Sequence, residues 1–183
     1  MKITHLQIKR FQEQHLPLVP ELTKMLHEAY KPLADKGFRY TATYQPPEKT
    51  LERLSRGESY LAFWGKQLAG TISLYPPMPN IKCEYYRKES IYHFGQYAVK
   101  PTFQGRGIGN ALLQFVEKRT KVLGGKELSL DTAEGAVELI TTYRRHGYEI
   151  VGTTQWSSTN YLSVVMTKKI KKINRQRFQK WTL

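Results

Sequence analysis

The most informative segment of the chain reads Val99-Lys100-Pro101-Thr102-Phe103-Gln104-Gly105-Arg106-Gly107-Ile108-Gly109-Asn110-Ala111-Leu112-Leu113. It predicts a strand that ends at a proline, then a turn with glycine at alternate positions, then an amphipathic helix. Glycine lets the backbone turn tightly and bring its N–H groups close to a ligand. The first turn of a helix adds unpaired N–H groups and a partial positive charge. Together these features predict a phosphate-binding turn, with the Arg106 side chain adding charge at its rim.

Two common phosphate-binding patterns do not fit this turn. The dinucleotide pattern G-x-G-x-x-G requires a third glycine where Asn110 stands, and the Walker pattern requires a Gly-Lys-Ser/Thr that does not follow. The pattern that remains is Gln-Gly-x-Gly-x-Gly, from Gln104 to Gly109. Taken alone, the turn is also consistent with a glycine-rich connection that binds nothing.

A second segment adds specificity, and it reads Tyr143-Arg144-Arg145-His146-Gly147-Tyr148-Glu149-Ile150-Val151-Gly152. It has a tyrosine near a helix end, followed by glycine, an aromatic residue and a strand. A short strand around Leu128-Ser129-Leu130-Asp131-Thr132 is expected between the two segments. In combination they resemble the GCN5-related N-acetyltransferase (GNAT) family. The resemblance covers about residues 3–168 and is specific between residues 91 and 167.

The resemblance implies both a fold and an activity. The fold is α/β (α+β), with one central mixed sheet of about seven strands flanked by about four helices, in a domain over residues 1–167. The activity is transfer of the acetyl group of acetyl-CoA to a primary amine, by direct attack in a ternary complex through a tetrahedral intermediate. The residues implied in binding coenzyme A are Ala98, Val99, Gln104, Gly105, Arg106, Gly107, Ile108 and Gly109.

The resemblance also makes Tyr143 the candidate general acid, which would protonate the departing thiolate. The alternative is a core tyrosine at helical spacing from Leu139 and Ile140. The chain departs from the family at one position. Many members carry asparagine near the pantetheine arm, seven residues before the tyrosine, where this chain has Ala136 and lacks that side-chain contact.

The general base is less well marked. His93 and Gln96 lie on the strand where many relatives keep a glutamate, and Gln96 cannot accept a proton at neutral pH. His93 can do so, directly or through water, and is the tentative base. A partly buried histidine without a catalytic role is the alternative. Glu84 and Glu89, in the preceding loop, are further candidates, and an amine of low pKa needs no base.

Aromatic residues are expected around the acceptor amine. The candidates come from the segments after the first helix and before the fourth strand, and packing beneath long loops is an equally good explanation of them. They are Phe38, Tyr40, Tyr44, Tyr85 and Tyr86. The basic charge of the chain favours a neutral or anionic acceptor, or a peptide end, over a polyamine.

Periodicity along the chain agrees with a single α/β domain without internal repeats. Period-two segments predict strands at 5–8, 59–64, 67–75, 91–99, 127–131, 149–156 and 161–167. Helical spacing predicts helices at 20–36, 47–57, 108–123 and 137–146, and residues 76–90 are expected to be loop.

Composition excludes several kinds of site. Cys83 is the only cysteine, which excludes an intrachain disulfide and a cysteine-built zinc site, and the five histidines have no metal-ligand spacing, so no metal is expected. No Gly-x-Ser-x-Gly elbow is present. The first residues lack the apolar run of a signal peptide, and no stretch is long and apolar enough to span a bilayer, so a cytoplasmic location is expected.

The net charge of +14 is concentrated toward a basic tail over residues 168–183, which interleaves cations with Ile, Phe and Trp. Such a tail can bind nucleic acid or a membrane surface, pack on a second subunit in a homodimer, or remain solvated. Two other functional classes also stay open. One is a non-catalytic acyl-CoA sensor of the same fold, and the other is an RNA-associated protein whose glycine turn grips backbone phosphate.

Overall fold

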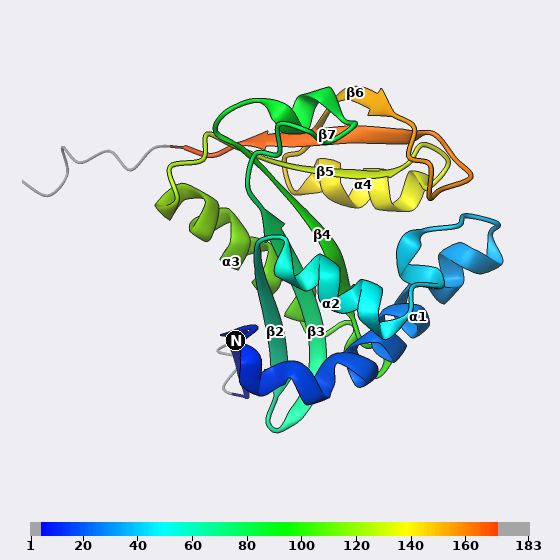
Figure 1. The fold of residues 1–183 in the computed structure, drawn as a ribbon, viewed down its shortest axis with the longest axis vertical. Coiled ribbons are helices and arrows are strands. Elements are labelled where there is room, and N and C mark those ends of the chain that lie inside the picture. The colour runs from blue at the N-terminus through cyan, green and yellow to red at the C-terminus, as the bar shows by residue number, and fades with distance from the viewer. Residues whose placement is uncertain (1–4, 172–183) are drawn as a thin grey trace, which may run out of the picture.

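The computed structural model describes residues 5–171, which form a seven-stranded sheet and four α-helices (Figure 1). The strands are β1 (Leu6–Arg10), β2 (Glu58–Trp64), β3 (Gln67–Tyr75), β4 (Ile91–Val99), β5 (Glu127–Ala133), β6 (Glu149–Thr154) and β7 (Ser163–Lys169). The α-helices are α1 (Val19–Asp35), α2 (Pro47–Ser55), α3 (Ile108–Val122) and α4 (Val137–Arg145). Four short 3-10 helices are η1 (Glu13–Leu18), η2 (Thr41–Thr43), η3 (Glu84–Arg87) and η4 (Pro101–Phe103).

The sheet is mixed, as predicted, with the strand order β1-β2-β3-β4-β5-β7-β6. Every neighbouring pair is antiparallel except β4 and β5, which are parallel. These two strands pair only from Ile91 to His93, opposite Glu127 to Ser129. Beyond His93 the two strands diverge, and this opening in the middle of the sheet positions the site described below.

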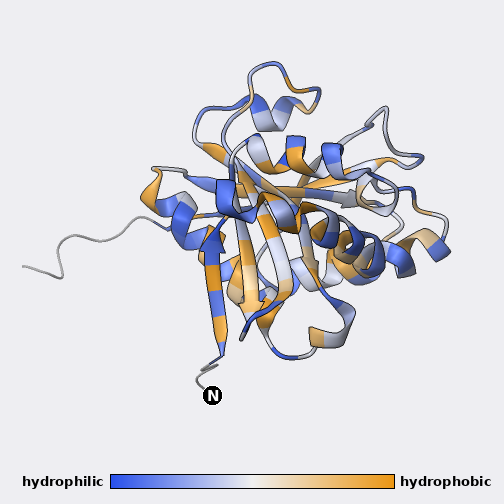
Figure 2. Cartoon of the chain, turned by 60° about the horizontal axis from the view of Figure 1, so that its bottom comes forward, coloured by the Kyte–Doolittle hydropathy of each residue, from blue (hydrophilic) through white to orange (hydrophobic). Residues whose placement is uncertain are grey.

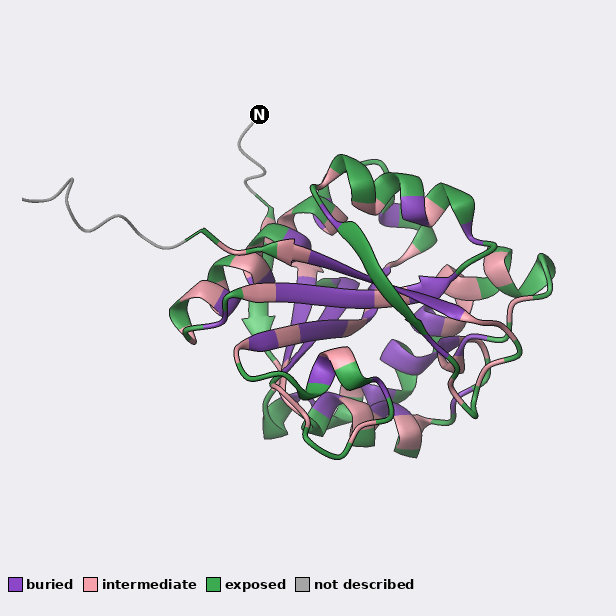
Figure 3. Cartoon of the chain, turned by 90° about the horizontal axis from the view of Figure 1, so that it is seen from above, coloured by how far each residue is buried: buried purple, intermediate pink, exposed green. Residues whose placement is uncertain are grey.

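The helices cover both faces of the sheet, because successive strand residues point to opposite sides. Tyr60 and Ala62 of β2 belong to the core beneath α3 and α4, whereas Leu61 packs with α1 and α2. Buried residues fill the central strands in Figure 3, and the helices carry bands of hydrophobic and hydrophilic residues in Figure 2. This burial of apolar surface is the main stabilising term of the fold.

Helix α3 is held against the sheet by a charged contact and a close approach. The Arg119 guanidinium donates two hydrogen bonds to the Glu58 carboxylate at the start of β2, at 2.6 and 2.7 Å. At the other end of the helix, a Cβ atom on Gly109 would lie 2.9 Å from the Tyr97 hydroxyl of β4. A side chain at this position would push the Tyr97 hydroxyl aside, so glycine allows α3 to begin close to β4.

The observed elements differ from the predicted ones mainly at strand ends. β5 continues to Ala133, because it pairs with β7 along its whole length. β7 continues to Lys169, and Ile170 packs against the core, so the first residues of the predicted basic tail belong to the sheet. Residues 172–183 lie outside the described part of the chain. Among the described residues, no helix is long and apolar enough to cross a membrane.

The contact between Glu58 and Arg119 predicts a pH-dependent contribution to stability. Hydrogen bonds from Arg119 lower the pKa of Glu58 to about 2, from its usual 4.5. Because the folded-state pKa is the lower one, the contribution is complete above about pH 4.5 and declines as the pH falls toward 2. We expect Glu58→Gln to lower the free energy of unfolding by about 1–2 kcal/mol at pH 7, measured by urea denaturation.

A matched control lies on α2, where Lys49 and Arg56 also lower the pKa of Glu52 to about 2. The Glu52 side chain is 49% exposed, against 17% for Glu58. Solvent screens exposed pairs, so Glu52→Gln should change stability little. Equal losses in the two variants would show that Glu58 does not anchor α3.

Candidate active site

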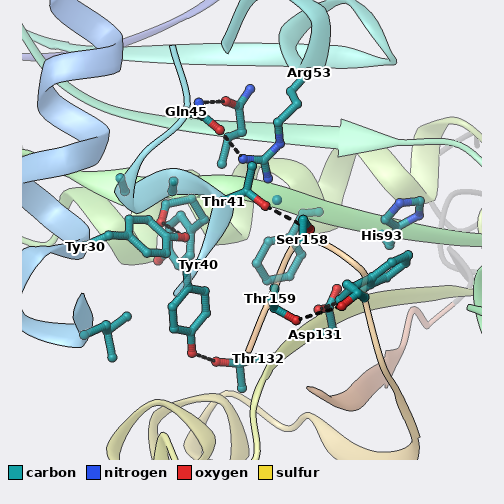
Figure 4. Close-up of a pocket in the computed structure, with 18 of the residues that line it drawn as sticks. Tyr30, Tyr40, Thr41, Gln45, Arg53, His93, Asp131, Thr132, Ser158 and Thr159 are labelled. Carbon is teal, nitrogen blue, oxygen red and sulfur yellow. Dashed lines mark hydrogen bonds between the residues drawn. The ribbon is translucent and has the colours of Figure 1, made fainter. Parts of the chain in front are cut away.

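The opening between β4 and β5 leads into one large cavity of about 990 Å³ (Figure 4). Its wall includes Tyr143 and Leu139 of α4 together with Tyr30 of α1 and Arg53 of α2. These helices cover opposite faces of the sheet, so the cavity passes through the sheet where the strands diverge. A ligand that enters from one face can therefore meet a second ligand that enters from the other.

A bulge in β4 shapes the edge of this opening. Thr71 of β3 pairs with Ala98 and Ser73 pairs with Gly95, so β4 carries one extra residue between these pairs. The backbone of Gln96 is strained at this bulge, because its φ of 47° is uncommon for any residue but glycine. The side-chain carbonyl of Gln96 accepts a hydrogen bond from the Gln45 amide at 2.9 Å, which helps to hold the bulge in place.

The main chain after the bulge presents polar groups to the opening. The Lys100 N–H donates to the Ala69 carbonyl of β3 at 2.9 Å, so strand alternation turns the peptide groups of Val99 away from β3. The Val99 carbonyl accepts a hydrogen bond from the Gln104 amide at 3.2 Å. The Tyr97 carbonyl accepts one from the Tyr30 hydroxyl, also at 3.2 Å. Ala98, Val99 and Gln104, which the sequence named as candidate cofactor-binding residues, all line the cavity.

The glycine turn has the geometry of an anion cradle. Gly105 and Gly107 have φ values of 75° and 78°, and Gly107 immediately precedes α3. No atom lies within 4 Å of the position that a Cβ on Gly105 would take, so the space beside the turn is open. The first intrahelical bond is donated by Ala111, which leaves the amides before it free of helical partners.

The Arg106 guanidinium lies over the rings of Trp64 and Phe103, 5.5 and 5.4 Å from their centroids. These cation–π contacts hold its charge beside the turn. The turn and the helix start thus provide main-chain donors, an open approach and one fixed cation, which suit the diphosphate of coenzyme A.

Tyr143 lies on the wall of the cavity near the end of α4. Its ring packs against Phe94 and Tyr148, at centroid distances of 6.1 and 6.0 Å. Burial raises the pKa of Tyr143 well above its usual 10, so the phenol is protonated at neutral pH. It therefore combines features of the two alternatives from the sequence, since it packs on the core and also faces the cavity.

His93 also lines the cavity, but its surroundings oppose protonation. The ring stacks on Tyr86 at 4.0 Å, and its Nδ1 atom has no hydrogen-bond partner among the described residues. Burial, helped by the charge of Arg56, lowers the pKa of His93 to about 3. The imidazole is thus neutral and a weak base. Glu84 and Glu89 are exposed and do not line the cavity.

Three of the five predicted acceptor residues, Tyr40, Tyr44 and Tyr86, line the cavity. Phe38 does not, because its ring packs edge-on against Tyr161 and lies against Gly135. Tyr85 does not either, because its hydroxyl donates to Glu127 at 2.6 Å and its ring lies under Lys88. The aromatic run therefore divides between the cavity wall and ordinary packing.

Several polar residues of the cavity carried no recognisable sequence signal. Arg53 of α2 donates to the Gln45 side-chain carbonyl at 2.6 Å. Asp131 of β5 accepts hydrogen bonds from Trp156 at 2.8 Å and Tyr86 at 3.0 Å, and burial raises its pKa. The burial of Thr50 and Leu54 places Arg53 beside the inner face of α2, but no motif marks it. Among the described residues, no cluster of three His, Cys, Asp or Glu side chains could hold a metal ion.

Comparison with known proteins places these features in context. The sequence model of the acetyltransferase (GNAT) family matches residues 20–148. The chain is 27% identical over 153 residues to S-(2-succino)cysteine N-acetyltransferase of Bacillus subtilis, a match that covers 82% of this chain and 90% of the relative.

Solved structures share the fold at low sequence identity. The ribosomal-protein-S18-alanine N-acetyltransferase of Escherichia coli aligns with a TM-score of 0.66 and 14% identity, over 93% of this chain and 97% of its own. The PaiA N-acetyltransferase of Thermoplasma acidophilum, in complex with coenzyme A, aligns with a TM-score of 0.64 and 19% identity, over 90% and 98%. The chain thus shares the fold of these acetyltransferases, and in this chain the seven-stranded sheet opens between β4 and β5.

The environment of His93 predicts an unusual titration. We expect its ring resonances to show no protonation between pH 8 and pH 5 in two-dimensional NMR, with His93→Gln used to assign them. Because the folded-state pKa is the lower one, the unfolded chain takes up a proton first below about pH 6.5. His93 therefore reduces stability as the pH falls from 6.5 toward 3. A midpoint near 6.5 would mean that the ring is solvated.

Proposed function

The chain belongs to the acetyltransferase (GNAT) family, and on that premise we propose that it transfers the acetyl group of acetyl-CoA to a primary amine by direct attack in a ternary complex. The observation that carries the proposal is the glycine turn before α3, because Gln104, immediately before the turn, lines a cavity that passes through the sheet. One face then serves coenzyme A, and the other serves the acceptor.

The residues for coenzyme A are those around the turn. The amides from Gly105 to Gly109 and the start of α3 would bind the diphosphate, with Arg106 beside them. The free peptide groups near Ala98 and Val99 would hold the pantetheine arm or the thioester carbonyl. Acetyl-CoA supplies the activated acetyl group, and the remaining chemistry belongs to side chains and main-chain donors of this chain.

The reaction forms one bond and breaks another. The amine nitrogen attacks the thioester carbonyl, the new C–N bond forms, and the C–S bond breaks. A main-chain N–H of β4 that donates to the developing oxyanion would lower the activation free energy by roughly 2.7–4 kcal/mol. Tyr143 donates its proton to the leaving sulfur as charge grows there. The proton that the amine nitrogen loses then restores the Tyr143 hydroxyl.

His93 is suited to a modest role in this proton transfer. Its low pKa keeps the ring neutral, so a ring nitrogen can accept a hydrogen bond from the incoming amine, while water carries the proton that the amine loses back to Tyr143. The protonated form of His93 is unfavourable because the ring is buried. We therefore propose that the amine binds in its neutral form, with His93 orienting it.

The proposed acceptor is a small-molecule or peptide amine. The S-(2-succino)cysteine named for the Bacillus subtilis relative is one member of that class and a sensible probe. We further propose a cytoplasmic location for the enzyme. Homodimer formation and contact with nucleic acid or a membrane stay predictions, and the tail on which they rest lies largely in residues 172–183, outside the described part of the chain.

The role of Tyr143 predicts a selective defect in turnover. Tyr143→Phe should lower kcat by tenfold or more and leave the affinity for acetyl-CoA nearly unchanged, because only the hydroxyl is removed. Release of free thiol is followed with acetyl-CoA and a panel of amines. Tyr148→Phe is the matched control, since Tyr148 lies in the same aromatic cluster but bonds to Glu117 and does not line the cavity.

Equal turnover in Tyr143→Phe and the parent would remove the acid role. If the parent binds acetyl-CoA but releases no thiol with any amine, the protein is a sensor rather than an enzyme.

The glycine turn predicts a selective loss of cofactor affinity. Gly107→Ala forces a Cβ into the left-handed region at a cost of about 1–2 kcal/mol, so the turn shifts. We expect the Kd for coenzyme A to rise by about tenfold in calorimetry. Gly124→Ala, with a φ of 79° at the far end of α3, carries the same strain away from the site. If both variants bound coenzyme A like the parent, the turn would not be its phosphate site.

A further inference from the structure

The wall of the cavity carries more positive than negative charge. Its acidic and basic side chains are Lys49, Arg53 and Arg56 of α2 and a single carboxyl group, that of Asp131. Lys49 and Arg56 both form ion pairs with Glu52. Arg53 is different, because no carboxylate among the described residues lies within 4.0 Å of it.

The Arg53 side chain is held in place by neutral partners. Its Nη1 atom donates to the Gln45 side-chain carbonyl. Gln45 is fully buried, and its amide donates to Thr50 at 2.7 Å and to Gln96 at 2.9 Å, which fixes the carbonyl toward Arg53. A guanidinium fixed in this way is organised in advance for a ligand.

The other terminal nitrogen of the guanidinium lies close to Gly95, where the absence of a side chain allows this approach. The Arg53 Nη2 atom lies 3.5 Å, and the Tyr75 hydroxyl 3.8 Å, from the position that a Cβ on Gly95 would take. The Tyr75 hydroxyl is buried and has no hydrogen-bond partner in the described part of the chain. Two donors thus converge above Gly95, on a wall of the cavity.

These donors lie on the acceptor side of the sheet. Arg53 comes from α2 and lies beside Gly95 in the middle of β4, whereas the glycine turn follows the end of β4 and leads into α3 on the other face. The diphosphate at the turn is therefore not the partner of Arg53. Asp131 lies on the same cavity wall but does not contact Arg53. A partly buried guanidinium that contacts no carboxylate favours an anionic ligand, and its planar fork matches a carboxylate.

Building on the proposed acetyl transfer, we propose that the acceptor is an amine that also carries a carboxylate, as amino acids do, and that Arg53 binds this carboxylate. The Tyr75 hydroxyl completes the receptor as a second donor. Met78, Ile81 and Trp156 line the cavity as well and provide room for an apolar substituent. Arg53 then determines acceptor specificity and takes no part in the chemical step.

The test compares acceptors that differ only in the carboxylate. Leucine is paired with isopentylamine and phenylalanine with phenethylamine, and thiol release from acetyl-CoA is measured. We expect kcat/KM to be at least tenfold higher for the amino acids. Arg53→Gln should lower kcat/KM by tenfold or more for the amino acids. For the plain amines it should change kcat/KM by no more than twofold, and the KM for acetyl-CoA should stay the same.

Lys31→Gln is the control, because it removes one positive charge from α1, on the same face of the sheet, at a residue that pairs with Asp35 and does not line the cavity. It should lower kcat/KM for the amino acids by twofold at most. Leucinamide and leucyl-glycine test where the carboxylate must stand. Loss of activity with both indicates a free amino acid, whereas activity with the dipeptide alone indicates a peptide end.

The inference is overturned if plain amines are the better acceptors, or if Arg53→Gln lowers kcat/KM equally for both members of a pair, while the proposed acetyl transfer stands in either case. Binding of N-acetyl-leucine to the protein saturated with coenzyme A tests Arg53 without turnover. We expect Arg53→Gln to weaken this binding tenfold or more, and weak, equal binding by both proteins would also overturn the inference.

Discussion

Two parallel strands that pair over only three residues leave a row of main-chain groups without sheet partners, and the site is built around that row. The pairing of β4 with β5 ends at His93. Beyond it, the polar groups of Tyr97 and Val99 need other partners, because buried donors and acceptors are costly when unpaired. The Tyr30 hydroxyl and the Gln104 amide satisfy two of the carbonyls. The other unpaired main-chain groups of this segment are available to hydrogen-bond with the cofactor and the acceptor.

The opening persists because packing on both sides holds it apart. Arg119 ties α3 to Glu58, and the close approach of Gly109 to Tyr97 fixes the start of that helix beside β4. On the other face, Gln45 holds the bulge at Gln96. The strained backbone of Gln96 is therefore maintained by its surroundings, as is common at functional sites. Both halves of the site inherit their geometry from this one strand.

Much of this architecture was predictable, because local patterns report it. The glycines from 105 to 109 and the alternation in residues 91–99 defined the turn and β4 with correct bounds. Strand ends were predicted less well, since pairing partners set them, as β7 shows by extending to Lys169. The positions of Arg53 and Asp131 on the cavity wall were not predictable. Each depends on neighbours from distant segments, such as Gln45 for Arg53 and Trp156 for Asp131.

The same reasoning explains why Phe38 and Tyr85 were wrongly grouped with the cavity residues. An aromatic residue in a loop can face a cavity or close a core, and only its neighbours decide between these outcomes. Tyr86 turns toward His93 and Asp131, whereas Tyr85, next along the chain, turns to Glu127. Adjacent residues in one short helix thus take opposite sides, so specificity in this fold depends on which side chains each loop directs into the opening in the sheet.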